Sequence, residues 1–299
     1  MTTVSVILPF IDGSAAFLAE AVESVLAQSH PAVELLLVND GASGPCRALA
    51  EDYQARYPGI IRVLAFEGGV NRGVSAARNL GLRHASGGVV ALLDADDVWL
   101  PGKLRDQLTL LESNPEVGML YGNTLYWYSW SGHVDDATRD FVPRLGLAAD
   151  RAVDPPGPLP GFLSGRFAVP CTCSVLLRRE VLERVGGFEE SFPDRYDDQV
   201  IWAKISLVAP VYVAGGCWDR YRQHPGSMTG GKDTEEIEAR ARQVYLEWLE
   251  KYLQDQGVSD PRVWKALTGE QRLLRLPPRA RRRLRQLRKA WWRASGLLR

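Results

Sequence analysis

The sequence predicts an α/β fold in which a mostly parallel, doubly wound central sheet is followed by a C-terminal helical appendage. Short apolar runs alternate with amphipathic segments through the first 114 residues, which is the pattern of repeated βα units. One run, Val89–Leu93, contains no polar residue, so we expect a strand buried on both faces, as in a parallel sheet. Beyond about residue 231 the chain is helical and increasingly basic, which indicates the appendage.

The first half is expected to contain four βα units. Val4–Pro9 opens the sheet, and Ser14 can cap the next helix because its hydroxyl accepts a backbone N–H. The later strands are expected at 33–38, 61–66 and 89–93, and the later helices end near residues 57, 84 and 114. Pro101 suits the first turn of the last of these helices. Right-handed connections between these units give a parallel sheet.

The second half has a less regular pattern. We expect strands at 117–121, 126–130, 175–177 and 211–213, and helices at 179–185 and 200–208. Residues 131–160 are polar and rich in proline, so they are expected to form a surface loop or flap. A long helix is expected from Asp233, with Glu236 completing a capping box, to Gly257.

Three carboxylates follow the buried strand directly, at Asp94, Asp96 and Asp97. The first two are two positions apart, so on an extended backbone their side chains point the same way and repel unless a cation lies between them. The carboxyl end of a parallel strand is also where open α/β sheets bind ligands. We therefore expect a divalent metal that holds a diphosphate. The alternative is that Asp97 caps the next helix and the other two are solvated.

The charge of the chain is divided unevenly, although its sum is zero. Residues 279–299 contain eight arginines and one lysine and no acid, which leaves 27 basic against 36 acidic residues in the body. The apolar residues of this tail recur at helical spacing, and Trp291 and Trp292 would suit a membrane interface. We expect it to lie on an anionic bilayer; the alternative is a helix docked on the acidic body or on a partner. Nucleic acid is not expected as a partner, because aromatic residues are not interleaved through the basic run.

The composition favours a cytoplasmic protein. The four cysteines include no Cys-x-x-Cys pair, which fits a reducing compartment and argues against a zinc site. The first strand begins at Val4, which leaves no room for a signal peptide, and no run of 18 apolar residues exists. We expect localisation in the cytoplasm, with peripheral binding to the inner face of the cell membrane through the tail.

Six motifs in order resemble the family 2 glycosyltransferases, inverting enzymes with the nucleotide-sugar-binding fold called GT-A. They are Val4–Pro9, Val38–Ser43, Asn71–Asn79, Leu93–Asp97, Arg178–Phe188 with Tyr196–Asp198, and Tyr221–Ser227. The resemblance covers roughly residues 3–230. It implies a glycosyltransferase domain over 1–230, with a nucleotide-binding half at 1–114 and an acceptor half at 115–230. Residues 231–299 are then a helical extension.

The resemblance implies a donor site in the first half. Pro9 lies where the chain wraps the nucleobase, and Asp40 matches the aspartate that accepts a hydrogen bond from uracil, which indicates a UDP-sugar. Arg78 is expected to face the diphosphate. Asp94 is expected to contact ribose or metal, and Asp96 to bind Mg²⁺ or Mn²⁺ directly. The alternatives are a turn residue for Asp40 and a surface helix charge for Arg78.

The resemblance also implies a catalytic base in the second half. The adjacent pair Asp197 and Asp198 stands where the family has Glu-Asp, so Asp198 is expected to take the acceptor proton and Asp197 to support it; spacing does not decide between them. The alternative is a helix N-cap. His224 is expected near the metal and phosphates, and Arg222 near the phosphates. The sequence departs from the family pattern at Asn39, which stands before Asp40 where the family more usually has an aspartate.

The expected function is metal-dependent transfer of a sugar from a nucleoside-diphosphate sugar to a saccharide or lipid-linked acceptor, in polysaccharide or glycolipid synthesis. A sugar-phosphate nucleotidyltransferase is a second hypothesis, but Pro9–Gly13 carries no basic residue where such enzymes have one. An inactive nucleotide-sugar-binding scaffold protein is a third. The retained carboxylates at 94, 96, 197 and 198 argue against it.

Overall fold

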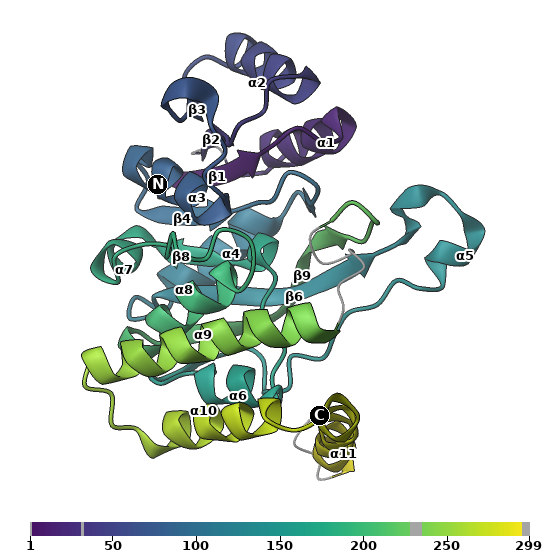
Figure 1. Ribbon diagram of the computed structural model, residues 1–299. Helices are drawn as coiled ribbons and strands as arrows, with labels where there is room; N and C mark the ends of the chain where they lie inside the picture. Colours follow the sequence, from purple (N-terminus) through teal and green to yellow (C-terminus); the bar gives the residue numbers. More distant parts are fainter. Residues whose placement is uncertain (1, 31–32, 228–234, 295–299) are drawn as a thin grey trace.

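The computed structural model describes residues 2–30, 33–227 and 235–294, and for 289–294 it describes the backbone alone. A curved sheet crosses the molecule, with strand order β3-β2-β1-β4-β8-β6-β9-β5 and β7 beside β9 (Figure 1). The strands are β1 (Val4–Phe10), β2 (Val33–Asn39), β3 (Ile61–Ala65), β4 (Val89–Leu92), β5 (Val98–Trp99), β6 (Met119–Trp127), β7 (Arg151–Val153), β8 (Leu176–Arg178) and β9 (Val211–Arg222).

The first half confirms the predicted parallel sheet. Strands β3, β2, β1 and β4 are parallel neighbours. Alternate residues of β1, from Val4 to Phe10, belong to one apolar cluster, and Ile7 between them belongs to the other. Helices α1 (Ala15–Leu26), α2 (Pro45–Arg56) and α4 (Lys103–Glu112) contribute to one cluster, and α3 (Val74–His84) to the other. Both faces are therefore covered, which is why Val89–Leu93 carries no polar residue. Ser14 caps α1 as predicted, since its hydroxyl accepts the N–H of Phe17.

The second half corrects several predicted boundaries. Strand β8 enters antiparallel between β4 and β6, so the sheet as a whole is mixed. The two strands predicted at 117–121 and 126–130 are one strand, β6, which is irregular between Tyr121 and Leu125. Strand β9 runs on through Gly215 and Gly216 to Arg222, because β6 and β5 pair with its later residues. Pro101 precedes the N-cap of α4, which is Gly102.

The segment predicted as a loop at 131–160 has secondary structure of its own. A short helix, α5 (Val134–Ala137), projects to the right in Figure 1, and β7 and α6 (Leu159–Ser164) follow it. Helix α7 (Arg179–Arg184), predicted at 179–185, is followed by two glycines with positive φ, Gly186 and Gly187. Helix α8 (Asp197–Val208) begins three residues before the predicted apolar run.

The C-terminal helices share a core with the second half of the sheet domain. Helices α9 (Glu235–Asp255) and α10 (Pro261–Leu274) pack on α6 and α8 through an apolar cluster that includes Leu163, Val200, Leu249 and Leu267. Helix α11 (Pro278–Ala294) follows, at the lower end of the molecule in Figure 1. The predicted cap at Asp233 lies outside the described residues, as do the side chains of Trp291 and Trp292. Within the described ranges, no helix combines the length and apolarity needed to cross a bilayer.

Gly73 fixes the turn that enters α3, and replacing it should destabilise the fold. Its φ is +87°, and an added Cβ would lie 2.6 Å from Pro193 Cβ and 2.9 Å from Pro193 Cα. With ψ of 160°, Gly73 lies in a backbone region essentially restricted to glycine, so strain of about 1–3 kcal/mol and overpacking of about 1–3 kcal/mol should both lower the free energy of unfolding in Gly73→Ala. Gly69→Ala is the control, because its φ is +62° but nothing lies within 4 Å of its Cβ position. Denaturant unfolding should show a larger loss for Gly73→Ala; equal losses would contradict the packing argument.

Candidate active site

A cavity of about 790 Å³ lies at the carboxyl ends of β1 and β4 and is lined by residues of both halves of the chain. It brings together eight of the predicted site residues: Pro9, Asp40, Arg78, Asp94, Asp96, Asp197, Asp198 and His224. This position agrees with the rule that open α/β sheets bind ligands beyond the carboxyl ends of their strands.

Asp40 is buried at the end of β2, where its carboxylate binds the backbone of the turn that enters α3. One carboxylate oxygen accepts the N–H of Arg72 at 2.6 Å and the other accepts the N–H of Gly73 at 3.0 Å. The neighbouring Asn39 closes its own turn, since its amide bonds both the N–H and the carbonyl of Ala42. Asp40 is therefore oriented in advance, and each oxygen keeps a further lone pair for a ligand.

Arg78 links the two halves of the chain and is not the surface charge considered from the sequence. It is 3% exposed. Its Nη2 donates to Asp94 at 2.8 Å, and its Nη1 forms a short hydrogen bond with Asp197. Burial opposes the charge of Arg78, but the carboxylates of Asp94 and Asp197 outweigh burial and hold the pKa of the guanidinium above its usual value. Its charge is therefore already shared by two acids on the cavity wall.

Asp96 and His224 form a pair on another part of the wall. The His224 Nε2 lies 2.9 Å from the Asp96 Oδ2, and the imidazole ring packs edge-on against Phe17. Burial and the nearby Asp94 raise the pKa of Asp96. Among the described residues, no group of three or more His, Cys, Asp or Glu side chains is placed to hold a metal ion. The carboxylate and imidazole of this pair nevertheless fit partial ligation, because Mg²⁺ is usually held by one or two carboxylates together with substrate phosphates.

Asp97 does not cap the next helix, so that interpretation was wrong. Its side chain is 1% exposed, and its Oδ1 accepts the backbone N–H of Arg222 at 2.9 Å. Burial, with the charges of Asp96 and Asp94, raises the pKa of Asp97 well above its usual value. Asp97 thus fastens the acidic turn to the end of β9, which is the strand that leads to His224.

The structure places Arg222 outside the cavity lining, although it was predicted to assist with phosphate. It is 1% exposed, its Nη2 bonds Glu20 at 2.6 Å, and its Nε donates to the carbonyl of Asp96 at 2.7 Å. Its guanidinium also lies over the rings of Phe17 and Trp127. Through these contacts, Arg222 stabilises the acidic turn at residues 94–97.

Asp197 and Asp198 occupy the first turn of α8, where the helix dipole favours negative charge. Burial nevertheless raises the pKa of both carboxyl groups, and for Asp198, with the adjacent charge of Asp197, it reaches about 7. Asp197 is occupied by Arg78, whereas the only side-chain contact described for Asp198 is with the N–H of Gln199. Asp198 is therefore the acid of this pair that is available to a ligand.

Two lining residues were missed from the sequence. Tyr196 has φ +60° and immediately precedes Asp197 and Asp198, and its hydroxyl donates to Glu238 of α9 at 2.7 Å. Glu238 lies 42 residues further along, in a helix whose amphipathic pattern indicates packing and nothing more. No sequence signal links the two, because only the folding of α9 across α8 brings them together.

Removing Arg78 should leave two carboxylates uncompensated inside the protein. We expect Arg78→Gln to lose about 3–5 kcal/mol of stability near neutral pH, the usual cost of breaking a buried ion pair. The loss should shrink in acid as the pH falls through the raised pKa of Asp197, because a protonated carboxyl group no longer needs the charge of the guanidinium. Arg83→Gln, at an exposed position of the same helix, is the control. Chemical unfolding at two pH values measures both; a loss no larger than that of Arg83→Gln would mean that the ion pairs carry little stability.

Comparison with known proteins agrees with this geometry. A family model described as "Glycosyl transferase family 2" matches residues 5–186. A relative from Nostoc sp., named as an uncharacterized glycosyltransferase, is 28% identical over 245 residues, which are 81% of this chain and 71% of the relative. An Escherichia coli protein named UDP-Glc:alpha-D-GlcNAc-diphosphoundecaprenol beta-1,3-glucosyltransferase is 32% identical over 120 residues, 40% of this chain and 45% of that protein.

Solved structures share the fold. Staphylococcus aureus TarS 1-349, in complex with UDP-GlcNAc, superposes with a TM-score of 0.63 at 18% identity, over 82% of this chain and 65% of that one. The mannosyltransferase PcManGT of Pyrobaculum calidifontis, in complex with GDP-Man and Mn²⁺, also gives 0.63, at 19% identity, over 99% and 76% of the two chains. The architecture is thus the GT-A fold. Because the family model covers more than half of its residues, this chain belongs to glycosyl transferase family 2 and is a glycosyltransferase.

Proposed function

We propose that this enzyme transfers a sugar from a UDP-sugar to a hydroxyl group of a saccharide or lipid-linked acceptor, with inversion at the anomeric carbon. The observation that carries the proposal is the placement of Asp198 in the same cavity as Asp40, Asp96 and His224. The same cavity offers Asp40 to a nucleotide and, in Asp198, a base with a pKa of about 7. Inverting transfer requires these two features on opposite sides of the sugar.

The nucleotide is proposed to bind along the first half. Asp40 is held by two backbone N–H groups and can accept the N3–H of a uracil with its remaining lone pairs. Pro9 lies on the same cavity wall. Support for UDP comes from the UDP-GlcNAc complex of TarS and from the UDP-Glc in the name of the Escherichia coli relative.

A divalent metal is proposed at Asp96 and His224, with Asp94 nearby. Bound there, Mg²⁺ or Mn²⁺ would compensate the negative charge that develops on the leaving diphosphate. The PcManGT complex contains Mn²⁺ together with its nucleotide sugar, which supports this chemistry for the fold. Arg78 adds positive charge from the wall, although Asp94 and Asp197 already share it.

Asp198 is proposed as the base. Its carboxylate would take the proton of the acceptor hydroxyl as the oxygen attacks the anomeric carbon from the face opposite the diphosphate. A single displacement of this kind inverts the centre and leaves the nucleoside diphosphate as product. Asp197 holds its neighbour in place through Arg78, so it is a positioning residue.

The surroundings of the acceptor are a further part of the proposal. Synthesis of a polysaccharide or glycolipid, and binding of 279–299 to the inner face of the membrane, remain predictions. The docked alternative for this tail gains support, because Arg282 of α11 pairs with Glu235 and Arg288 pairs with Glu270. The extent of the glycosyltransferase domain, residues 1–230, also remains a prediction.

Asp96→Ala should weaken metal-dependent binding of UDP. One carboxylate fewer leaves the diphosphate charge poorly compensated, so we expect the dissociation constant for UDP with Mn²⁺ to rise by at least about tenfold, or ~1.4 kcal/mol. Calorimetry with and without Mn²⁺ measures this, and Asp135→Ala, at an exposed acid of α5, is the control. Undiminished metal-dependent affinity in Asp96→Ala would remove Asp96 from the metal site.

Asp198→Asn should abolish most turnover and leave UDP binding intact. We expect the rate of UDP release to fall by roughly 10²- to 10⁴-fold, the usual contribution of a positioned base, and Asp197→Asn to cost less. In the wild type the rate should rise with pH through about 7, because the base must lose its proton. The assay measures UDP release with a panel of nucleotide-sugar donors, each combined with a saccharide or a lipid-linked acceptor. Normal turnover of both variants would indicate a helix cap, and wild-type UDP binding without turnover would indicate a scaffold protein.

The same variant should change the pH dependence of stability. The pKa of Asp198 is about 7 when folded against a usual value of 3.8, so between these values the folded state keeps a proton that the unfolded state loses. The contribution of this group to stability therefore falls as the pH rises through that window. Asparagine has no such dependence, so Asp198→Asn should melt at a higher temperature than the wild type at about pH 8, and the difference should shrink towards pH 4.

A further inference from the structure

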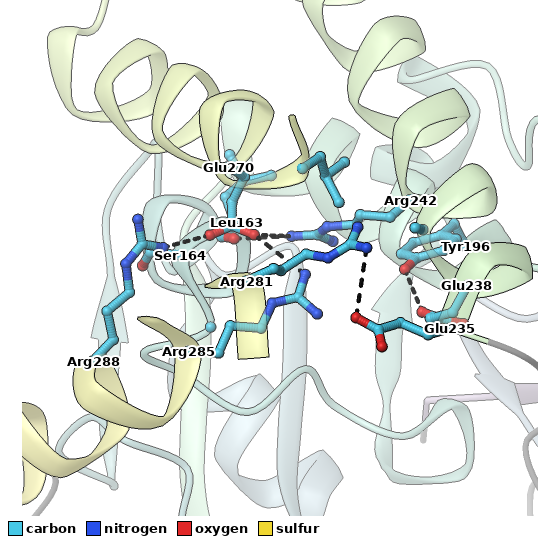
Figure 2. Close-up of a pocket in the computed structure, with 13 residues that line it drawn as sticks. Leu163, Ser164, Tyr196, Glu235, Glu238, Arg242, Glu270, Arg281, Arg285 and Arg288 are labelled. Atoms are coloured by element: carbon cyan, nitrogen blue, oxygen red, sulfur yellow. Dashed lines mark hydrogen bonds and ion pairs between the residues drawn. The ribbon is translucent and has the colours of Figure 1, made fainter. Parts of the chain in front are cut away.

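A second cavity, of about 320 Å³, lies where helices α9, α10 and α11 meet the end of α6 (Figure 2). Its volume is within the usual range of small-molecule sites, roughly 300–1,000 Å³. Four arginines line it: Arg242 of α9, and Arg281, Arg285 and Arg288 of α11. None of these residues has a role in the proposed donor site.

The arginines of this cavity outnumber the acids they face. Glu270 is 4% exposed, and its carboxylate lies 2.7 Å from Arg288 and 3.9 Å from both Arg242 and Arg285. Figure 2 shows these guanidinium groups arranged around the carboxylate of Glu270. Three guanidinium groups therefore share the one carboxylate of Glu270, and over the whole lining four arginines face three acids, Glu235, Glu238 and Glu270.

Glu235 does not restore the balance. It faces two arginines, with Arg281 at 3.5 Å and Arg282 closer. Arg281 is only 6% exposed, and its buried Nε has no hydrogen-bond acceptor among the described atoms. A buried donor without an acceptor is costly, and an anionic ligand would supply one.

This cavity adjoins the proposed active site. Tyr196 and Glu238 line both cavities, and the hydrogen bond between them stands at the boundary. Tyr196 directly precedes Asp197 and Asp198 in the chain. A ligand that occupied the arginine cavity and extended past Tyr196 would therefore bring its other end towards the proposed base.

We infer that the arginine cavity binds a diphosphate group of the acceptor. Guanidinium groups bind phosphate oxygens through paired, charge-assisted hydrogen bonds, which makes phosphate the anion that such a cluster suits best. Arg285 and Arg288 are 46% and 37% exposed and so can reach a ligand while Glu270 stays buried. The inference rests on the proposed function, since the acceptor is defined by it. The same chemistry would also accept free diphosphate, so the test compares the two sources.

The first experiment measures binding of inorganic diphosphate and of farnesyl diphosphate by calorimetry, in EDTA and at low salt. EDTA suppresses metal-dependent binding at the donor site. We expect both probes to bind the wild type, and Arg285→Gln/Arg288→Gln to weaken both by about tenfold or more, as for loss of charged hydrogen bonds. The single variant Arg285→Gln should show part of the effect. The control is Arg279→Gln/Arg283→Gln, which removes the same charge from exposed positions of α11 outside the cavity lining.

Three outcomes of these binding measurements would contradict the inference. Equal affinities in the wild type and in Arg285→Gln/Arg288→Gln, or no binding of either probe, would overturn the inference. Binding of inorganic diphosphate without binding of farnesyl diphosphate would overturn the assignment to the acceptor. If phosphatidylglycerol vesicles, and neither diphosphate, lost affinity in this variant, the arginines would form a membrane contact and the inference would fail.

A separate measurement keeps this test apart from the proposed function. Binding of UDP with Mn²⁺ should be the same in the wild type and all three α11 variants, because the donor site lies in the other cavity. Absence of UDP binding in the wild type would contradict the proposed function and leave the diphosphate result standing on its own. Melting temperatures of the variants report whether α11 remains docked.

Discussion

The ion pairs of Arg78 are the constraint on which the site depends. A guanidinium that is 3% exposed must have its charge balanced, and the two acids that balance it come from opposite halves of the chain. Asp94 ends the last parallel strand, and Asp197 begins α8. The fold can bury Arg78 only if these two ends meet, so the same contact that satisfies the arginine also brings together the two parts of the chain that line the cavity.

The other carboxylates of the site differ in their hydrogen-bond partners. The Oδ1 of Asp97 accepts the N–H of Arg222, and the Oδ2 of Asp96 lies within hydrogen-bond distance of the His224 Nε2. Among the described residues, the only hydrogen bond of the Asp198 side chain is the one that it accepts from the N–H of Gln199, and its pKa is raised. The acids that position the turn are thus engaged, and the acid with an available carboxylate is the one whose proton affinity suits a base near neutral pH. The proposed role of Asp198 therefore rests on the fold leaving this carboxylate without a strong partner.

The C-terminal helices extend this arrangement beyond the site. Helix α9 packs on α8 through Leu249 and its neighbours and carries Glu238 to the hydroxyl of Tyr196. Helix α11 then brings its arginines to the acids of α9 and α10. A tail that looks like a separate basic segment in the sequence is, over its described side chains, part of the wall of a cavity that adjoins the candidate active site.

Local sequence determined the first half of this protein. The run Val89–Leu93, the cap at Ser14 and the acidic turn each depend on neighbours within a few positions, so the parallel sheet and most of the site residues could be predicted. Tertiary structure alone decided what those residues contact. Arg78 was predicted to face the diphosphate and Arg222 to assist with phosphate, but burial gave each arginine an acidic partner more than a hundred residues away, Asp197 and Glu20. Strand β6 appeared broken because its irregular register is set by β9. The pairing of distant charges is a property of packing, and no local pattern records it.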